Sequence, residues 1–477
     1  MREHDRLFIG GDWTAPSGTG TIDVVSPHTE EVVGRVPDGT AADIDAAVAA
    51  ARHAFDHGPW PRMTPAERAE IIGRLAAIYA ERQQEMADLV TAEMGSPILF
   101  SIFGQAALPQ MVLQYHADLA ASFTWEEERA GMLGPVTVTR EPVGVVAAIY
   151  PWNVPQFTLM LKLAPALVAG CTVVAKPSPE APLDGFLLAE WIREAGVPDG
   201  VVNIVPAGRE VGAHLVAHPG VDKVAFTGST DAGRRIGAVC GERLKACTLE
   251  LGGKSAAIIL PDADLAATVE GLKMASLMNN GEACAAQTRI LAPRARYDEV
   301  ADALAAMVGG LAVGDPADYG TEIGPLVARR QRERVEGYIR IGQEEGAKII
   351  TGGLSRPHDR GWYVTPTLFG DVSNDMRVAR EEIFGPVLAL IPYDDEDDAV
   401  RIANDSDYGL GGSVWTADVA HGVEVARRVR TGSCGVNLYV LDPNTPFGGY
   451  KDSGLGRELG PEGVSPYLEY KAIPRPS

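Results

Sequence analysis

Short runs rich in valine and isoleucine alternate with long alanine-rich runs from about residue 40 onward, and this alternation is what most restricts the fold. The clearest stretch has buried-strand patterns at 143–150, 171–177 and 201–208, separated by helical patterns at 157–170 and 182–196. Strands joined through helices run parallel, with right-handed crossovers that cover both faces of the sheet. The sequence therefore predicts an α/β fold built on a parallel sheet.

The same pattern restarts in the second half of the chain. A strand pattern at 254–260 is followed by a helical pattern at 262–280 and another strand pattern at 289–295. A restart after a glycine-rich turn indicates a second sheet, so we place a domain boundary near residue 252.

Two segments fit neither sheet. Residues 136–141 and 467–473 both alternate like half-exposed strands. Strands with open edges need partners, and we expect a second subunit to supply them.

Charge and cysteine content restrict the possible partners. A net charge of −22 argues against nucleic acid or an anionic membrane as the main partner. The uncharged, apolar run at residues 163–175 is too short to span a bilayer, and the charged N-terminus does not resemble a signal peptide. Five scattered cysteines, with no metal-ligand spacing, predict neither a disulfide framework nor a metal site and fit a reducing cytoplasm.

Two polar residues at predicted strand ends are candidates for catalysis. Glu250 lies between two leucines, and apolar surroundings raise the pKa of a carboxylate toward the range of a general base. Asn153 ends another strand, where its amide could donate to a developing oxyanion. Each also has a structural interpretation, Glu250 as a buried ion-pair member and Asn153 as a turn residue.

Two other strand ends are candidates for phosphate or ribose binding. The segment 224–239 runs from a strand through the turn TGST into a helix, whose first amides suit a pyrophosphate, although an ordinary turn has the same pattern. Lys176 ends the strand at 171–177, the edge at which open α/β sheets bind ligands, or is a solvated lysine.

Cys284, in the stretch NNGEAC, follows the predicted helix at 262–280. The negative end of a helix dipole disfavours a thiolate, so a catalytic Cys284 needs another cation nearby, such as a nicotinamide ring.

Taken together, these motifs resemble those of the NAD(P)-dependent aldehyde dehydrogenase superfamily over nearly the whole chain. Eight blocks occur in the family's order: EPVGVVAAIYPWN (141–153), AKPS (175–178), FTGST (226–230), LELGGKS (249–255), NNGEAC (279–284), EEIFGPV (381–387), ANDSDYGL (403–410) and PFGGYKDSGLGRE (446–458).

The resemblance implies oxidation of an aldehyde to its carboxylic acid. Cys284 would be the nucleophile that carries a thiohemiacetal and then a thioester, and Glu250 would activate the water that releases the acid. Asn153 and the backbone amide of Cys284 would form the oxyanion hole. Lys162 and Asn437 match supporting positions near the active site.

The resemblance also implies a cofactor, NAD with NADP possible, and no metal. Lys176 and Glu382 would hold the riboses, Phe384 would pack near the nicotinamide, and Gly228 and Ser229 would contact the pyrophosphate. The remaining positions that match the cofactor site are Ile149, Trp152, Ser178, Gly208, Gly212, Phe226 and Leu251.

Two departures from the family pattern affect this interpretation. Pro179 stands where NAD-preferring members commonly have a glutamate, and Glu180 follows one residue later. Glu282 replaces the usual glutamine, and its carboxylate would raise the pKa of Cys284 if it pointed inward, so we expect it to point away.

The positions that match the family's substrate pocket are mostly apolar and favour an uncharged aldehyde of medium size: Val154, Phe157, Thr158, Leu161 and Phe447. No arginine occurs in 437–447 to bind a carboxylate, and no aromatic cage for a quaternary ammonium is evident.

The implied fold has three parts: a dinucleotide-binding domain (1–122 and 143–252), an α/β catalytic domain (253–452) and a small β ribbon with the C-terminal segment (123–142 and 453–477), which would build a homodimer or homotetramer. Two rival functions remain, a thiol hydrolase that uses the same cysteine and glutamate, and a non-catalytic protein of this fold. The second would be expected to lose Cys284, Glu250 or Asn153, and all three are present.

Overall fold

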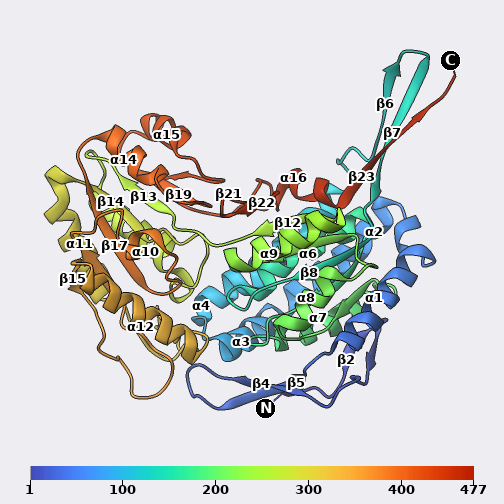
Figure 1. Ribbon diagram of the computed structural model, residues 1–477, viewed down its shortest axis with the longest axis horizontal. Coiled ribbons are helices and arrows are strands. Elements are labelled where there is room, and N and C mark those ends of the chain that lie inside the picture. The colour runs from blue at the N-terminus through green and yellow to red at the C-terminus, as the bar shows by residue number, and fades with distance from the viewer. Residues whose placement is uncertain (1, 477) are drawn as a thin grey trace.

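The computed structural model describes residues 2–476. Two mostly parallel sheets lie side by side, and a narrow β ribbon projects from the body of the molecule (Figure 1). The sheets change between Glu250, which ends one strand of the first, and Ala256, which begins the second.

The first sheet has eight strands in the order β22-β12-β11-β8-β9-β10-β2-β3, of which the central five run parallel. Their bounds are β2 Leu7–Ile9, β3 Asp12–Thr14, β8 Val145–Ile149, β9 Thr172–Lys176, β10 Val202–Ile204, β11 Lys223–Thr227, β12 Ala246–Glu250 and β22 Gly454–Leu455. The strands predicted at 143–150, 171–177 and 201–208 are thus confirmed as neighbours.

Alternate residues of these strands pack under different helices. In β8, Val146 and Ala148 face a core shared with α2, α3, α5, α6 and α7, whereas Val145 and Ala147 face α1, α8 and α9. The helix bounds are α1 Ala41–Asp56, α2 Pro65–Glu81, α3 Gln83–Met94, α4 Ile98–Phe100, α5 Leu108–Leu119, α6 Pro155–Ala169, α7 Leu183–Glu194, α8 Arg209–Ala217 and α9 Thr230–Arg243.

The second sheet has the order β15-β16-β17-β14-β13-β19-β20 and is parallel except at β15. Its strands are β13 Ala256–Ile259, β14 Arg289–Pro293, β15 Lys348–Thr351, β16 Thr367–Gly370, β17 Val387–Tyr393, β19 Gly412–Trp415 and β20 Gly435–Val436. Its helices are α10 Leu265–Leu277, α11 Tyr297–Gly309, α12 Arg329–Glu344, α13 Arg377–Arg380, α14 Glu396–Asn404 and α15 Val419–Arg428, and α16 Gly460–Val464 follows near the C-terminus.

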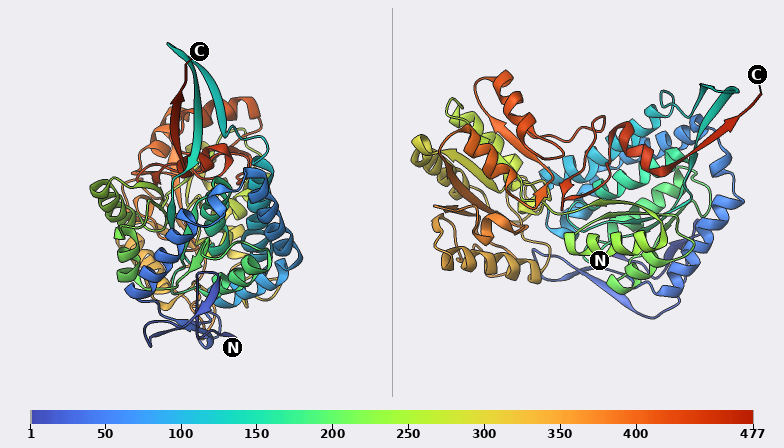
Figure 2. Two further views of the ribbon diagram at one scale, coloured as in Figure 1. Left: turned by 90° about the vertical axis from the view of Figure 1, so that its right-hand side faces the viewer. Right: turned by 45° about the horizontal axis from the view of Figure 1, so that its top comes forward.

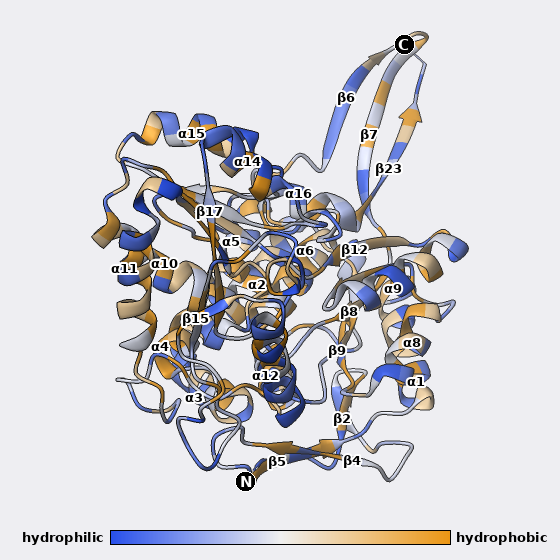
Figure 3. Ribbon diagram, turned by 60° about the vertical axis from the view of Figure 1, so that its left-hand side comes forward, coloured by the Kyte–Doolittle hydropathy of each residue, from blue (hydrophilic) through white to orange (hydrophobic). Residues whose placement is uncertain are grey.

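Helix α12 shows how a very polar sequence still joins the core. Hydrophilic residues dominate its length (Figure 3), but Val335, Tyr338 and Ile339 are buried against the second sheet. Apolar residues at this spacing lie on one face of a helix, which is sufficient to anchor it.

The two segments that were expected to pair with a second subunit pair with each other within the chain. Strand β7 (Gly134–Pro142) lies between β6 (Glu126–Gly131) and β23 (Leu468–Pro474), and register runs from Leu468 opposite Pro142 to Pro474 opposite Val136. This three-stranded sheet is the projecting ribbon (Figures 1 and 2). Its outer strands are β6 and β23.

Smaller elements join the two halves. The N-terminal sheet of β1 (Arg2–Glu3), β4 (Thr21–Val25) and β5 (Val32–Pro37) continues into a turn at Glu30 and Glu31, whose carboxylates pair with Arg329 and Arg360 of the second half. The short strands β18 (Tyr408–Gly409) and β21 (Tyr450–Lys451) pair before β22 adds to the first sheet. None of the helices within residues 2–476 combines the length and apolar character that a bilayer crossing requires.

Candidate functional site

Cys284 lies in a turn that is held by side chains from distant segments. After α10 ends, Asn279, Asn280 and Gly281 take successive φ values of 52°, 62° and 72°. Asparagine tolerates the left-handed conformation better than most non-glycine residues, but several left-handed residues in succession still need support from their surroundings. The Asn280 amide supplies it by donating to the carbonyls of Gly95 and Pro325, 3.0 Å from each.

The environment of Cys284 disfavours its thiolate. Burial, followed by the charges of Glu382 and Glu250, raises the pKa of the Cys284 thiol to about 12. A positively charged ring beside the sulfur would oppose all of these effects.

Asn153 is buried, and its side-chain amide reaches across the chain. Its Nδ2 donates to the carbonyl of Glu282 at 2.8 Å, two residues before Cys284. An amide nitrogen has two N–H groups, so one remains to donate to another oxygen. Asn153 was alternatively interpreted as a turn residue with a local hydrogen bond, but its side-chain amide donates to the distant Glu282 instead.

The backbone around Asn153 is fixed by two further amides. Gln105 and Asn279 both donate from their side chains to the Asn153 carbonyl at 2.9 Å. Gln105 belongs to a π-helical segment, Ser101–Ala107, and Tyr79 donates to its carbonyl. Sequence reasoning missed Gln105, since a π-helix leaves no periodicity by which it could be recognised.

Glu250 ends β12 as a buried carboxylate. Neither of its carboxylate oxygens has a hydrogen-bond partner among residues 2–476. Burial first, and then the charge of Glu458, raises its pKa well above the ordinary value, whereas Lys162 acts in the opposite direction. A buried carboxylate without a protein partner is suited to bind and deprotonate a water molecule.

Lys162 is fully buried behind Glu250. Its ammonium donates to Glu458 Oε1 at 2.8 Å, to Thr227 Oγ1 at 2.5 Å and to the Thr158 carbonyl at 3.3 Å. The supporting position of Lys162 is therefore that of a buried ion-pair member. Glu458 was quoted as the last residue of a motif, but nothing in the sequence showed that it lies beside Glu250.

Glu282 points away from Cys284, as expected. Its Oε1 accepts a hydrogen bond from the backbone amide of Val327 at 3.2 Å, and its charge is not among the causes of the raised pKa of Cys284. Burial raises the pKa of Glu282 itself well above the ordinary value. Asn437, the other supporting position, itself has a φ of 58°. Its side chain is hydrogen bonded to the backbone of Thr416.

Lys176 ends β9 with its ammonium buried. Nζ donates to the carbonyls of Pro177 at 2.8 Å and Ala207 at 2.7 Å, which leaves a third N–H. Burial lowers the pKa of Lys176 to about 8. Two residues on, Ser178 donates to Glu180, and Arg330 of α12 also pairs with Glu180.

Two helices begin at the same edge of the sheet. Gly208 is the N-cap of α8, and a Cβ built there would meet nothing within 4 Å. Ser229 caps α9 through its hydroxyl, which accepts from the amide of Ala232. A Cβ on Gly212 would lie 3.2 Å from Lys176, so this glycine leaves room for the lysine. The other first-turn amides of such helices are available to an anion.

The second half contributes a loop to this edge. Gly253 donates its amide to Glu382 Oε1 at 3.1 Å, and burial raises the pKa of Glu382 to about 6. Phe384, at φ of 63°, stacks edge-on against Trp152 with ring centroids 5.4 Å apart. Gln331 and Arg334 of α12 donate to carbonyls of this loop, a support that sequence reasoning also missed.

The remaining predicted cofactor positions are Ile149, Phe226, Gly228 and Leu251, which lie at or just beyond the carboxyl ends of β8, β11 and β12. Topology alone brings them together, since the carboxyl ends of parallel strands share one edge.

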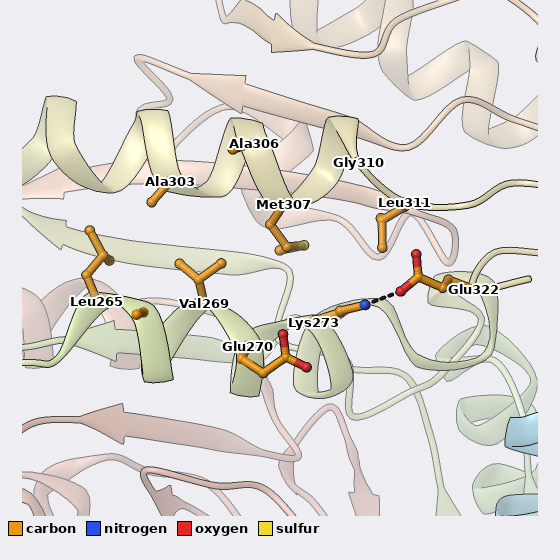
Figure 4. A pocket seen from close by; sticks show the side chains of 11 residues that line it. Leu265, Val269, Glu270, Lys273, Ala303, Ala306, Met307, Gly310, Leu311 and Glu322 are labelled. Carbon is orange, nitrogen blue, oxygen red and sulfur yellow. Dashed lines mark ion pairs between the residues drawn. The ribbon is translucent and has the colours of Figure 1, made fainter. Parts of the chain in front are cut away.

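Cys284 packs against the large apolar core cluster of the first sheet. Phe157, Leu161, Tyr439 and Phe447 are buried in the same core cluster, against which Val154, Trp152, Leu441 and Cys284 pack. A separate groove of about 620 Å³ lies between α10 and α11, with the Lys273–Glu322 ion pair at one end (Figure 4), and its lining contains none of the predicted site residues.

Residues 13–473 match the model of the aldehyde dehydrogenase family. The chain is 50% identical over 472 residues to geranial dehydrogenase of Castellaniella defragrans, covering 99% of this chain and 98% of the relative. Its structure resembles that of a Mycobacterium tuberculosis aldehyde dehydrogenase complexed with NAD+, with 51% identity, a TM-score of 0.98 and coverage of 100% and 99% of the two chains.

A second solved relative is aldehyde dehydrogenase C of Pseudomonas syringae, a cysteine-to-alanine mutant in complex with NAD+ and octanal. It is 44% identical, with a TM-score of 0.95, over 98% of this chain and 96% of the relative. The family model spans nearly the whole chain, and both the close relatives and the motifs agree with it. The chain belongs to the aldehyde dehydrogenase family.

Proposed function

We propose that this enzyme oxidises uncharged, apolar aldehydes to carboxylic acids with NAD+. The observation that carries the proposal is the contact between the buried Asn153 amide and the Glu282 carbonyl, which holds an N–H donor beside the segment of Cys284. Glu250, a buried carboxylate without a hydrogen-bond partner among residues 2–476, lies close enough to raise the pKa of the same cysteine.

The chemistry of these residues gives a sequence of steps. The Cys284 thiolate adds to the aldehyde carbon, and the free N–H of Asn153 with the amide of Cys284 stabilises the alkoxide. A bound nicotinamide supplies the hydride acceptor. The thioester left on Cys284 is hydrolysed by water that Glu250 deprotonates.

The residues at the shared sheet edge fit a dinucleotide. The uncrowded N-cap of α8 at Gly208 and the first turn of α9 after Gly228 and Ser229 offer amides to a pyrophosphate. Lys176 and Glu382 would bind ribose hydroxyls, and Trp152 and Phe384 would border the nicotinamide. The negative charge of Glu180 beside Ser178 favours NAD over NADP, because a 2′-phosphate would be repelled.

The apolar lining supports the substrate class. Cys284 packs against a cluster that includes Phe157, Leu161 and Phe447. Two relatives point the same way, since one is named geranial dehydrogenase and another was crystallised with octanal.

An aldehyde panel tests both parts of the proposal. Octanal and geranial should be oxidised with kcat/KM well above that of succinic semialdehyde or betaine aldehyde, measured at the absorbance of reduced nicotinamide with NAD and NADP in parallel. Ester cleavage without cofactor-dependent aldehyde oxidation would instead favour the thiol hydrolase.

We further propose the assembly and organisation of the chain. Residues 1–122 and 143–252 form the cofactor-binding unit, 253–452 the catalytic unit, and 123–142 with 453–477 the segments that build a homodimer or homotetramer. The open edges of β6 and β23 support this assembly. The five free thiols support a reducing compartment, which we take to be the cytoplasm.

A further inference from the structure

Two cysteines outside the active site face each other between a helix and a strand. Cys240 lies on α9 and Cys247 on β12, which pack together near the edge of the first sheet (Figure 1). Positions 233, 237 and 240 share one face of the helix, and 247, 249 and 251 share one face of the strand.

Contacts along this interface fix which residues are opposite. A Cβ built on Gly233 would meet Leu251 at 2.4 Å, and one on Gly237 would meet Leu249 at 3.5 Å. The helix therefore runs antiparallel to the strand, and the next contact in the series joins Cys240 to Cys247. The two thiols lie close enough for each to shift the pKa of the other.

The surroundings give the two thiols different characters. Cys240 is 1% exposed, whereas Cys247 is partly exposed. Interaction with the Cys240 thiol, helped by the nearby Lys223 and opposed by burial, lowers the pKa of Cys247. Cys247 is thus the accessible nucleophile, and Cys240 is placed behind it as the second thiol.

We propose that Cys240 and Cys247 form a peroxide-reactive dithiol that closes to an intramolecular disulfide. The Cys247 thiolate attacks one oxygen of hydrogen peroxide, the O–O bond breaks, and Cys247 sulfenic acid and hydroxide form. The Cys240 thiol then attacks the sulfenic sulfur, the S–O bond breaks, and water leaves as the S–S bond forms. The two thiols together lose two electrons, which the peroxide gains.

Peptide mapping tests this proposal directly. The full-length Cys284→Ala protein, in which the proposed nucleophile cannot consume oxidant, is treated with a small excess of hydrogen peroxide, alkylated after denaturation and digested with trypsin. Cleavage after Arg235, Arg243, Lys245 and Lys254 separates Cys240 (236–243) from Cys247 (246–254). We expect one cross-linked peptide that dithiothreitol splits, while Cys171 and Cys434 stay alkylated.

Two variants in the same background are matched controls. Cys240→Ser should lose the cross-link and leave Cys247 as a sulfenic acid that dimedone traps, whereas Cys247→Ser should leave Cys240 alkylated. Both must keep the elution volume and melting temperature of the parent. Separate peptides after peroxide treatment, with both cysteines alkylated or with Cys247 oxidised to sulfinic acid, would overturn the proposal.

Discussion

Cys284 differs from the other cysteines in the groups that face its sulfur. Cys171 is buried and donates to the Tyr467 carbonyl, and Cys434 packs near Gly412, so both serve the core. Cys284→Ala should abolish aldehyde oxidation and ester hydrolysis together, because no thioester can form. Alanine at Cys171 or Cys434 should leave most of the activity, measured in the same two assays. Residual ester hydrolysis in Cys284→Ala would show that another nucleophile is used.

The role of Glu250 can be separated from that of Cys284 by rapid mixing. Glu250→Gln keeps the shape of the side chain but cannot accept a proton, so we expect the steady-state rate to fall by about 10²–10⁴-fold. A burst of reduced cofactor, at most one per active site, should remain. Loss of the burst would mean that Glu250 acts before hydride transfer, by deprotonating the thiol whose pKa is raised.

The raised pKa of Glu282 predicts that the free energy of unfolding depends on pH. Its folded-state pKa is raised well above the ordinary 4.5, so folding favours the protonated form. The stabilisation that folding gains from protonating Glu282 is fully present below about pH 4.5. It is lost as the pH rises toward the folded-state pKa, by up to about 1.4 kcal/mol for each pH unit.

Glu282→Gln removes this titration while keeping a neutral side chain of the same shape. The melting temperature of the variant minus that of the wild type should therefore increase from pH 5 to pH 9 in calorimetric scans. The exposed Glu424→Gln serves as the control and should show a constant difference. A Glu282→Gln difference that also stays constant would contradict a protonated Glu282.

Among the single elements, the turn after β9 is the one that we propose to discriminate between NAD and NADP. Glu180 is held by Ser178 and Arg330, so Glu180→Gln would remove the negative charge and free the guanidinium for a 2′-phosphate. The ratio of kcat/KM for NADP to that for NAD should rise about tenfold, equivalent to about 1.4 kcal/mol. Glu30→Gln, which loses a similar exposed pair with Arg329, is the matched control. An unchanged ratio for Glu180→Gln would place the discrimination elsewhere.

Elements with strong local patterns could be predicted from the sequence. The strands β8, β9 and β14 and the helices α6 and α10 all lie where hydrophobic periodicity placed them, because burial on one or two faces determines the pattern. The candidate site residues at strand ends were predicted from parallel topology and the family motifs.

What the sequence did not reveal depends on contacts between distant segments. Glu458 reaches Lys162 across 296 residues, and Gln105 reaches the Asn153 carbonyl from a π-helix. The pairing of β7 with β23 likewise has no local signal, since any two half-exposed strands alternate in the same way.

At the scale of the whole molecule, we expect the three-stranded ribbon to take part in the proposed homo-oligomer. Deleting residues 467–477 removes β23 and uncovers one edge of β7. Smaller and less stable particles are expected by size-exclusion chromatography with light scattering, because the proposed assembly would lose the outer strand of the ribbon. Removing only residues 476 and 477 is the control and should leave the mass unchanged. An unchanged mass in the longer deletion would count against a role of β23 in assembly.

The pairing of the chain's last strands with its earlier ones has a consequence for synthesis on the ribosome. β22 completes the sheet edge beside Glu250, and β23 completes the ribbon with β7. Strands β12 and β7 therefore lack one neighbour until residues beyond 453 have been synthesised. During translation the first sheet and the ribbon remain open while the whole second sheet is made. Contacts so distant in sequence also close slowly. The nascent chain therefore cannot finish either structure until those residues have been made, and its open strand edges are suited to bind a chaperone in the meantime.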